Sequence, residues 1–116
     1  MKMNNSIKAE LKSHILSCIN DEVLTDDNVE DWHHHAFNES YYIIGYYNAS
    51  EWLKEHNVDA FDAVDTVREY EVDNFGEMST KVNSESIVNM YVYILGEQLL
   101  GDIGADSIEE LKEAVA

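Results

Sequence analysis

Apolar residues recur every three or four positions along most of this chain, and no proline interrupts them. Such spacing collects apolar side chains on one side of an α-helix. Asn-Gly and Asp-Gly turns, which mark tight hairpins between strands, are absent from the sequence. We therefore predict an all-α fold, a compact single domain of about five to six helices over residues 1–116.

Helix-capping residues indicate where these helices begin and end. The first helix is expected at about residues 6–19, where apolar residues repeat every four positions from Ile7 to Ile19. The last is expected after Ser107, which forms a capping box with Glu110. The other expected N-caps are Ser6, Asn38 or Ser40, Asp59, and Ser84 or Ser86, and the expected helix ends are Gly76 and Gly101.

Two segments rich in β-branched and aromatic residues leave a second fold class open. They are YYIIGYY at 41–47 and VNMYVYIL at 88–95. Short strands at both places would make the domain α+β. Because both apolar patterns continue into flanks with helical spacing, we favour helices there.

The chain carries 24 acidic and 7 basic residues, a net charge of −17. Residues 1–20 hold three lysines against Glu10, so the first helix is net positive, whereas the rest holds 23 acids against four bases. A compact body with this much like charge repels itself. Solubility of a small domain needs a net charge of only about 2–8. The excess therefore suggests a function for the carboxylates.

The segment 59–73 shows how the carboxylates are arranged. Four acids spaced three, four and four residues apart stack on one face of a helix, with a rise of roughly 4.5–6 Å between neighbours. A second acidic concentration lies at 26–31. Rows of this kind are also ordinary solvated faces of helices, and that interpretation stays open beside a functional one. The candidate acids are Asp62, Asp65, Glu69 and Asp73, with Asp26, Asp27, Glu30 and Asp31. The apolar side of the 59–73 helix is expected to hold Phe61, Val64, Val67, Glu71 and Phe75.

Tyrosines occur in pairs within 41–47, so some of them must lie outside the core in either secondary structure. Tyrosine buries contact area at low entropic cost and keeps a polar tip. Beside carboxylates it suits arginine-rich partners, through cation–π contacts and charge-assisted hydrogen bonds. The candidate contact residues are Tyr41, Tyr42, Tyr46 and Tyr47.

The histidine run at 33–35 contains two carboxylate–histidine spacings, Glu30 to His33 and Asp31 to His34. Di-iron helical bundles use this spacing twice, and the chain holds no second copy. We therefore expect no metal or other cofactor, with His33 packed on the apolar side and the next two histidines near the surface. A small metal-binding protein using Glu30, His33 and His34 is kept as a second alternative.

Other chemical signatures are missing from the sequence. The single cysteine, Cys18, lies among isoleucine and leucine and is expected as a small buried hydrophobe. No serine lies in a G-x-S-x-G context, and no lysine follows the glycines of 96–104 to complete a phosphate loop. We therefore expect no enzymatic activity. Without an apolar leader or a membrane-length segment, the chain is expected in the cytoplasm.

Three blocks within about residues 32–100 resemble a family of small acidic proteins encoded by tailed bacteriophages. They are HHHAFNESYYIIGYYNASEWL, REYEVDNFGE and VNMYVYILGEQLL. The resemblance implies a phage protein that acts on host machinery in the host cytoplasm, and it implies no catalytic residue. Small acidic phage proteins include DNA-mimic inhibitors, an analogy of charge and size alone.

We therefore expect an acidic phage-type inhibitor that binds a basic nucleic-acid-binding surface of a host or defence protein, as anti-restriction or anti-CRISPR proteins do. The acidic candidates would replace phosphates at Arg and Lys clusters, and the tyrosines would supply contact area. The same charge disfavours direct binding to nucleic acid, and no membrane contact is expected. The first alternative is a structural or assembly protein that forms a homodimer or larger homo-oligomer. Its acidic residues would then only keep it soluble.

Overall fold

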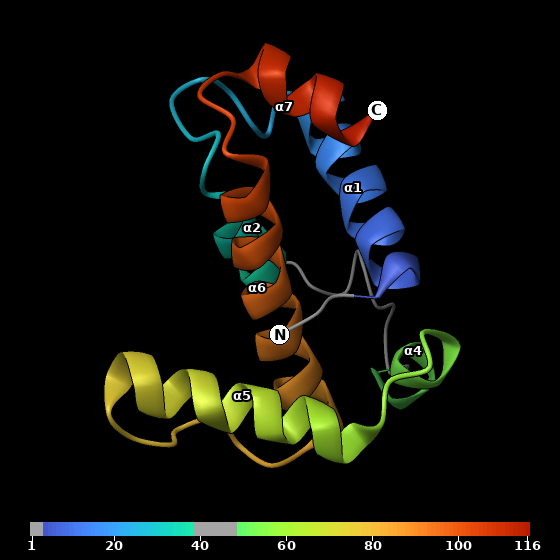
Figure 1. Cartoon of the computed structure of the whole chain (residues 1–116), viewed down its shortest axis with the longest axis vertical. Coiled ribbons are helices and arrows are strands. Elements are labelled where there is room, and N and C mark those ends of the chain that lie inside the picture. The colour runs from blue at the N-terminus through green and yellow to red at the C-terminus, as the bar shows by residue number, and fades with distance from the viewer. Residues whose placement is uncertain (1–3, 39–48) are drawn as a thin grey trace.

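One helix, α6 (Ser84–Ile103), forms the centre of the structure (Figure 1). Ten of its residues are buried, and they lie on nearly every side of it. A helix that is apolar all round must be covered by other elements on each face. The computed structural model describes residues 4–38 and 49–116. The other helices in these residues are α1 (Asn5–Asn20), α2 (Trp32–Asn38), α4 (Ala49–Glu55), α5 (Ala60–Phe75) and α7 (Ile108–Val115).

The described residues contain six helices and no strand, which confirms the all-α prediction. The alternative prediction of a strand at 88–95 is wrong, because this segment forms the middle of α6. Most of its β-branched and aromatic side chains are buried against the helices that surround α6. The segment 41–47 lies outside the described residues. No helix within the described ranges is long and apolar enough to cross a membrane.

The peripheral helices cover α6 from several directions. Figure 1 shows α2 alongside α6, α5 crossing its lower end, and α1 running down the other side of the molecule with α7 over its end. The expected helix at 6–19 is α1, and it buries one apolar stripe in the common core. The buried residues of α1 are Ile7, Leu11, Ile15, Cys18 and Ile19.

Side-chain caps fix the helix ends, some of them a few residues from the predicted positions. At the start of α1 the Oδ1 of Asn4 accepts a hydrogen bond from the Ile7 amide at 2.8 Å. Asparagine is at least as good an N-cap as serine. At both α1 and α6 an asparagine precedes the predicted serine and takes the cap, so the helix begins earlier. The predicted caps Ser6 and Ser84 or Ser86 are wrong, because Asn4 and Asn83 cap these helices. Helix α6 continues past Gly101 and ends before Gly104, and Asn38 lies at the end of α2. The predicted caps Asp59, Gly76 and Ser107 are confirmed.

The indole of Trp32 lies directly on α6 at Gly96. A Cβ at position 96 would stand 2.8 Å from Trp32 Cζ3 and 3.2 Å from His33 Cβ. Trp32 is fully buried, and its Nε1 donates to Nδ1 of His14 in α1 at 3.1 Å. The glycine therefore allows a large core side chain to bridge the central helix and α1.

Gly96→Ala is expected to lower the free energy of unfolding by about 1–3 kcal/mol, because the added methyl overlaps the buried indole. In an unobstructed helix the same change raises stability by up to about 1 kcal/mol. Gly101→Ala is the matched control in α6, because a Cβ there meets no atom within 4 Å. Urea denaturation of both variants tests this contact, and equal effects at the two positions would contradict it.

Candidate functional site

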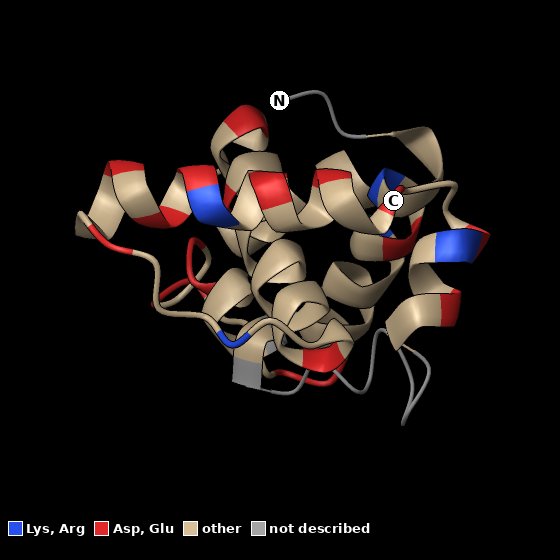
Figure 2. Cartoon of the chain, turned by 90° about the horizontal axis from the view of Figure 1, so that it is seen from below, with Lys and Arg blue, Asp and Glu red and all other residues tan. Residues whose placement is uncertain are grey.

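The acids predicted to share one face of α5 form a row on its solvent-exposed side, here called the acidic row. Figure 2, which views α5 from below, shows acidic residues along the length of this helix. The row faces outward because the opposite side of α5 carries Ala63 and Val67 into the core. Its members, Asp62, Asp65, Glu69 and Asp73, are all exposed.

The apolar side of α5 differs from the prediction at both ends. Phe61 is 80% exposed and Phe75 is 59% exposed, whereas Ala63 takes a core position. The buried side of α5 is centred on Ala63, Val67 and Glu71, so Phe61 lies to one side of it. The C-terminal end of α5, which carries Phe75, extends past the central helix (Figure 1). The exposed Val72 lies with Phe61 on the flank of α5 next to the acidic row, whereas the ring of Phe75 lies edge-on to that of Tyr70 with centroids 6.0 Å apart.

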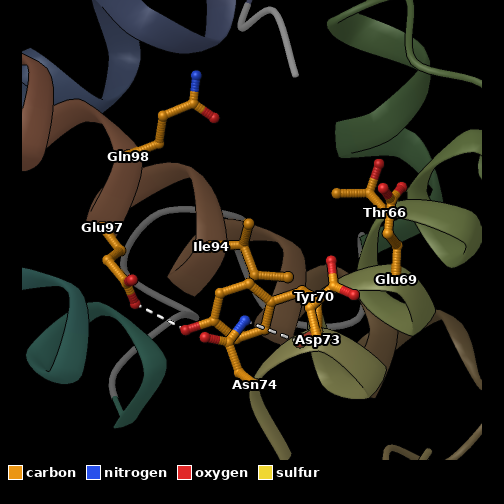
Figure 3. Close-up of a pocket in the computed structure, with 8 residues that line it drawn as sticks. All are labelled: Thr66, Glu69, Tyr70, Asp73, Asn74, Ile94, Glu97 and Gln98. Atoms are coloured by element: carbon orange, nitrogen blue, oxygen red, sulfur yellow. Dashed lines mark hydrogen bonds between the residues drawn. The ribbon is translucent and has the colours of Figure 1, made fainter.

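A groove of about 380 Å³ lies between α5 and α6 on the other flank of the row (Figure 3). Three carboxylates stand in its walls, those of Glu69 and Asp73 from α5 and that of Glu97 from α6. Such a groove offers several anionic oxygens to one cationic side chain, and arginine binds carboxylates in two-pronged fashion. The remaining lining residues are Thr66, Tyr70, Asn74, Ile94 and Gln98.

The phenol of Tyr70 joins the two walls of the groove. Its hydroxyl donates to Oε2 of Glu97 at 2.7 Å, and Nδ2 of Asn74 donates to the Tyr70 carbonyl at 2.9 Å. Burial, together with the nearby Glu97 carboxylate, raises the pKa of Tyr70 above its ordinary value. The phenol therefore stays protonated at physiological pH and holds Glu97 at the edge of the groove.

Behind this groove, rings from three helices meet around Tyr93 of α6. Its centroid lies 4.9 Å from that of His33, 5.4 Å from His34, 5.7 Å from Phe37 and 6.3 Å from Tyr70, all edge-on. Edge-to-face aromatic pairs are worth about 0.5–1.5 kcal/mol each beyond their burial. The cluster fixes α2 and α5 relative to α6, and so fixes the groove walls.

His33 is buried in this cluster as predicted, while His34 is exposed and His35 is intermediate. Burial, and then the neighbouring His34, lowers the pKa of His33. The ring is therefore neutral at physiological pH, and its 4.0 Å approach to Glu97 is no strong ion pair. In the part of the chain that the structure describes, no three His, Cys, Asp or Glu residues are grouped to hold a metal ion, and this includes Glu30 with the histidines.

The second acidic concentration lies at the other end of the molecule from α5 (Figure 1). With Asp106 it surrounds a polar hollow of about 270 Å³. Oδ1 of Asp26 also accepts the Ile108 amide at 2.8 Å, so this carboxylate anchors the start of α7. The two sets of candidate acids therefore form separate surfaces. The exposed members here are Asp26, Asp27, Glu30 and Asp31.

The four tyrosine candidates, Tyr41, Tyr42, Tyr46 and Tyr47, lie outside the described residues. Tyr70 and Glu97 were not predicted as site residues. Glu97 interrupts the otherwise apolar run of α6, and Tyr70 adjoins the apolar positions of α5. Helical phasing of both helices would have placed the two side by side once α5 and α6 were known to cross.

Glu71 is a buried carboxylate that fixes the loop following α5. It is 1% exposed, and its Oε1 accepts from Arg68 at 2.9 Å. Oε2 accepts three hydrogen bonds of 2.6–2.8 Å, from the amide and hydroxyl of Ser79 and the amide of Thr80. Burial alone would raise the pKa of Glu71, but the hydrogen bonds from Ser79 and Thr80 outweigh it and lower the pKa to about 2.

No family model, no curated protein and no solved structure matches this chain. The resemblance to acidic phage proteins therefore remains an expectation from the sequence.

The charge of Glu71 is expected to stabilise the fold by on the order of 3 kcal/mol at neutral pH, because its pKa falls from the ordinary 4.5 to about 2 on folding. A lowered folded-state pKa contributes stability that is complete above pH 4.5 and is lost as the pH falls from 4.5 towards 2. Glu71→Gln should lower stability at pH 7 and remove this part of the pH dependence.

Urea unfolding of the wild type and the variant between pH 7 and pH 2 measures that difference. Glu69→Gln changes the same charge on an exposed residue of α5, and it should alter stability by no more than about 0.5 kcal/mol. Parallel pH curves for the wild type and Glu71→Gln would show that the carboxylate does not stabilise the fold.

Proposed function

We propose that this chain binds a basic nucleic-acid-binding surface of a host or defence protein through α5, and so blocks that surface against nucleic acid. The observation that supports this most directly is the acidic row, which borders a groove walled by three carboxylates. Among the described residues no Lys, Arg or His forms an ion pair with the row, and its carboxylates follow one another at a rise of roughly 4.5–6 Å. A DNA strand presents one phosphate per about 3.4 Å, so the row is a looser array of the same sign.

Local charge pairing supports a binding role for the row. Arg68 is the one basic residue of α5, and it donates to the buried Glu71 and to the Thr80 carbonyl. It therefore turns away from the row. Like charges at adjacent turns cost a few tenths of a kcal/mol per pair. A cationic partner would remove this repulsion when it binds.

The apolar flank of α5 supports contact with a folded protein surface. Phe61 and Val72 expose hydrophobic area on the flank beside the carboxylates. Protein interfaces combine buried aromatic anchors with charged contacts at the rim. A basic protein surface that carries apolar residues between its arginines fits this combination better than bare nucleic acid, which the net charge repels.

Neutralising the row is expected to weaken capture of the partner roughly 10- to 100-fold at low salt, because the close charge pairs are lost. The variant combines Asp62→Asn, Asp65→Asn, Glu69→Gln and Asp73→Asn. A second variant removes the same charge from exposed acids elsewhere, by Glu22→Gln, Asp102→Asn, Glu109→Gln and Glu113→Gln. A third neutralises Asp26, Asp27, Glu30 and Asp31 and tests the opposite end of the molecule.

The measurement is recovery of partners from host lysate, followed by titration of the purified partner between about 50 mM and about 200 mM salt. We expect a steep loss of affinity with salt and displacement by duplex DNA. Affinity that is unchanged by salt, or that falls equally in the first two variants, would contradict the proposal. Recovery of no partner from a bait that runs as a discrete oligomer would favour a structural role instead.

A further inference from the structure

The first turn of α1 and the end of α4 bring together a serine, a histidine and a glutamate. Oγ of Ser6 lies 2.6 Å from Nδ1 of His56, and Nε2 of the same ring hydrogen-bonds Oε2 of Glu10. Ser6 and Glu10 are one helical turn apart in α1, and His56 directly follows α4. Serine, histidine and carboxylate in this order form the arrangement that activates a hydroxyl as a nucleophile.

The partners of Glu10 decide which nitrogen of a neutral His56 carries the proton. Oε1 of Glu10 accepts from Nε1 of Trp52 at 3.1 Å, and an ionised carboxylate only accepts hydrogen bonds. The neutral ring must therefore carry its proton on Nε2, which donates to Oε2. Nδ1 is then a free base, and the hydroxyl of Ser6 donates to it. This is the tautomer that general-base catalysis requires.

Packing holds the imidazole in this orientation. His56 is 7% exposed, and its ring lies edge-on to that of Trp52 with centroids 4.6 Å apart. Nδ2 of Asn4 donates to the His56 carbonyl at 2.8 Å. Both ring nitrogens and the backbone of the base are thus engaged, so the base is preorganised against the hydroxyl.

The nucleophile itself lies at the surface, where a substrate can reach it. Ser6 is exposed although the base beneath it is buried. The side chain of Asn4 takes the Ile7 amide. The amides of Asn5 and Ser6 belong to the first turn of α1 and have no acceptor inside the helix. Backbone N–H groups beside a nucleophile are suited to stabilise an oxyanion.

We propose that Ser6 is a nucleophile activated by His56, and that this site cleaves carboxylic esters by acyl transfer. The activity is separate from the binding surface on α5 and uses none of its residues. The sequence gives no signal for it, because Ser6 lacks the G-x-S-x-G context and lies fifty residues from His56.

Hydrolysis at this site needs water as its only co-reactant. Oγ of Ser6 bonds to the ester carbonyl carbon, its proton passes to Nδ1 of His56, and the carbonyl electron pair moves onto oxygen. Collapse of this intermediate breaks the bond to the leaving alcohol, which takes the proton from Nδ1. Water then attacks the acyl-serine with the same base, releasing the acid and restoring Ser6. Ser6 and His56 are the catalytic residues, and Glu10 is a positioning residue.

The test treats the full chain with a fluorophosphonate probe, in which a serine hydroxyl displaces fluoride at phosphorus. We expect one covalent adduct per chain, mapped to Ser6 by peptide mass spectrometry, and hydrolysis of p-nitrophenyl acetate. Ser6→Ala should abolish both, and it should leave the fold intact because Ser6 is exposed. Ser13→Ala, at an exposed serine of the same helix, should change neither.

His56→Ala should slow labelling by roughly 10²–10⁴-fold, as expected for loss of a general base, and added imidazole should restore part of the rate. Glu10→Gln tests the positioning role, because its amide can donate to Nε2 and shift the proton to Nδ1. Imidazole ¹⁵N chemical shifts should then report the other tautomer and labelling should fall. A folded wild type that stays unlabelled, or labelling that persists in Ser6→Ala, would overturn the proposal.

Discussion

Burial of α6 on all sides is the constraint on which the rest of the structure depends. A helix with buried residues around its whole circumference is stable in water only when other elements cover each face. One of these coverings is the contact of Trp32 with Gly96, which brings an indole ring against the α6 backbone where a Cβ at position 96 would stand. The short helix α2 is thereby held along α6, and the rings around Tyr93 follow from that placement.

Several polar groups that this packing buries find partners on helices distant in sequence, whereas Nδ1 of His33 and Oδ1 of Asn89 are buried without one among the described residues. Both tryptophans donate their N–H to groups of α1, Trp32 to His14 and Trp52 to Glu10. An unpaired buried donor would cost about 1–3 kcal/mol. Each indole therefore holds its hydrogen-bond partner in place in addition to packing in the core. Glu71 does the same for the loop between α5 and α6. The groove and the Ser6 site are both positioned by such pairs.

The sequence predicts the helical class and the face that α5 exposes, because both depend on residue spacing within one element. The buried His33 and Cys18 were predicted for the same reason. The exposed Phe61 and Phe75 were not, because their exposure depends on which side and which part of α5 is covered where it crosses α6. Contacts over long sequence separations, such as Tyr70 with Glu97, depend on that same crossing and are invisible to local patterns. The Asn4 cap was missed by two positions, since neighbouring residues compete for the same role.

Stability alone does not explain where the acidic residues lie on this fold. Between Glu85 and Glu97 the central helix carries no acidic residue, and among the described acidic residues Glu71 alone is buried. Three adjacent pairs in the acidic row cost about 1 kcal/mol together, and burying a single Leu or Ile contributes about 1.5–3 kcal/mol. The core therefore tolerates the row easily, and many other placements of the charge would be tolerated too. The row differs from the acids of α7 in what surrounds it: the exposed Phe61 and Val72 on one flank and a groove walled by carboxylates on the other. Those neighbours, more than the charge itself, are the reason to propose a contact surface on α5 and not on α7.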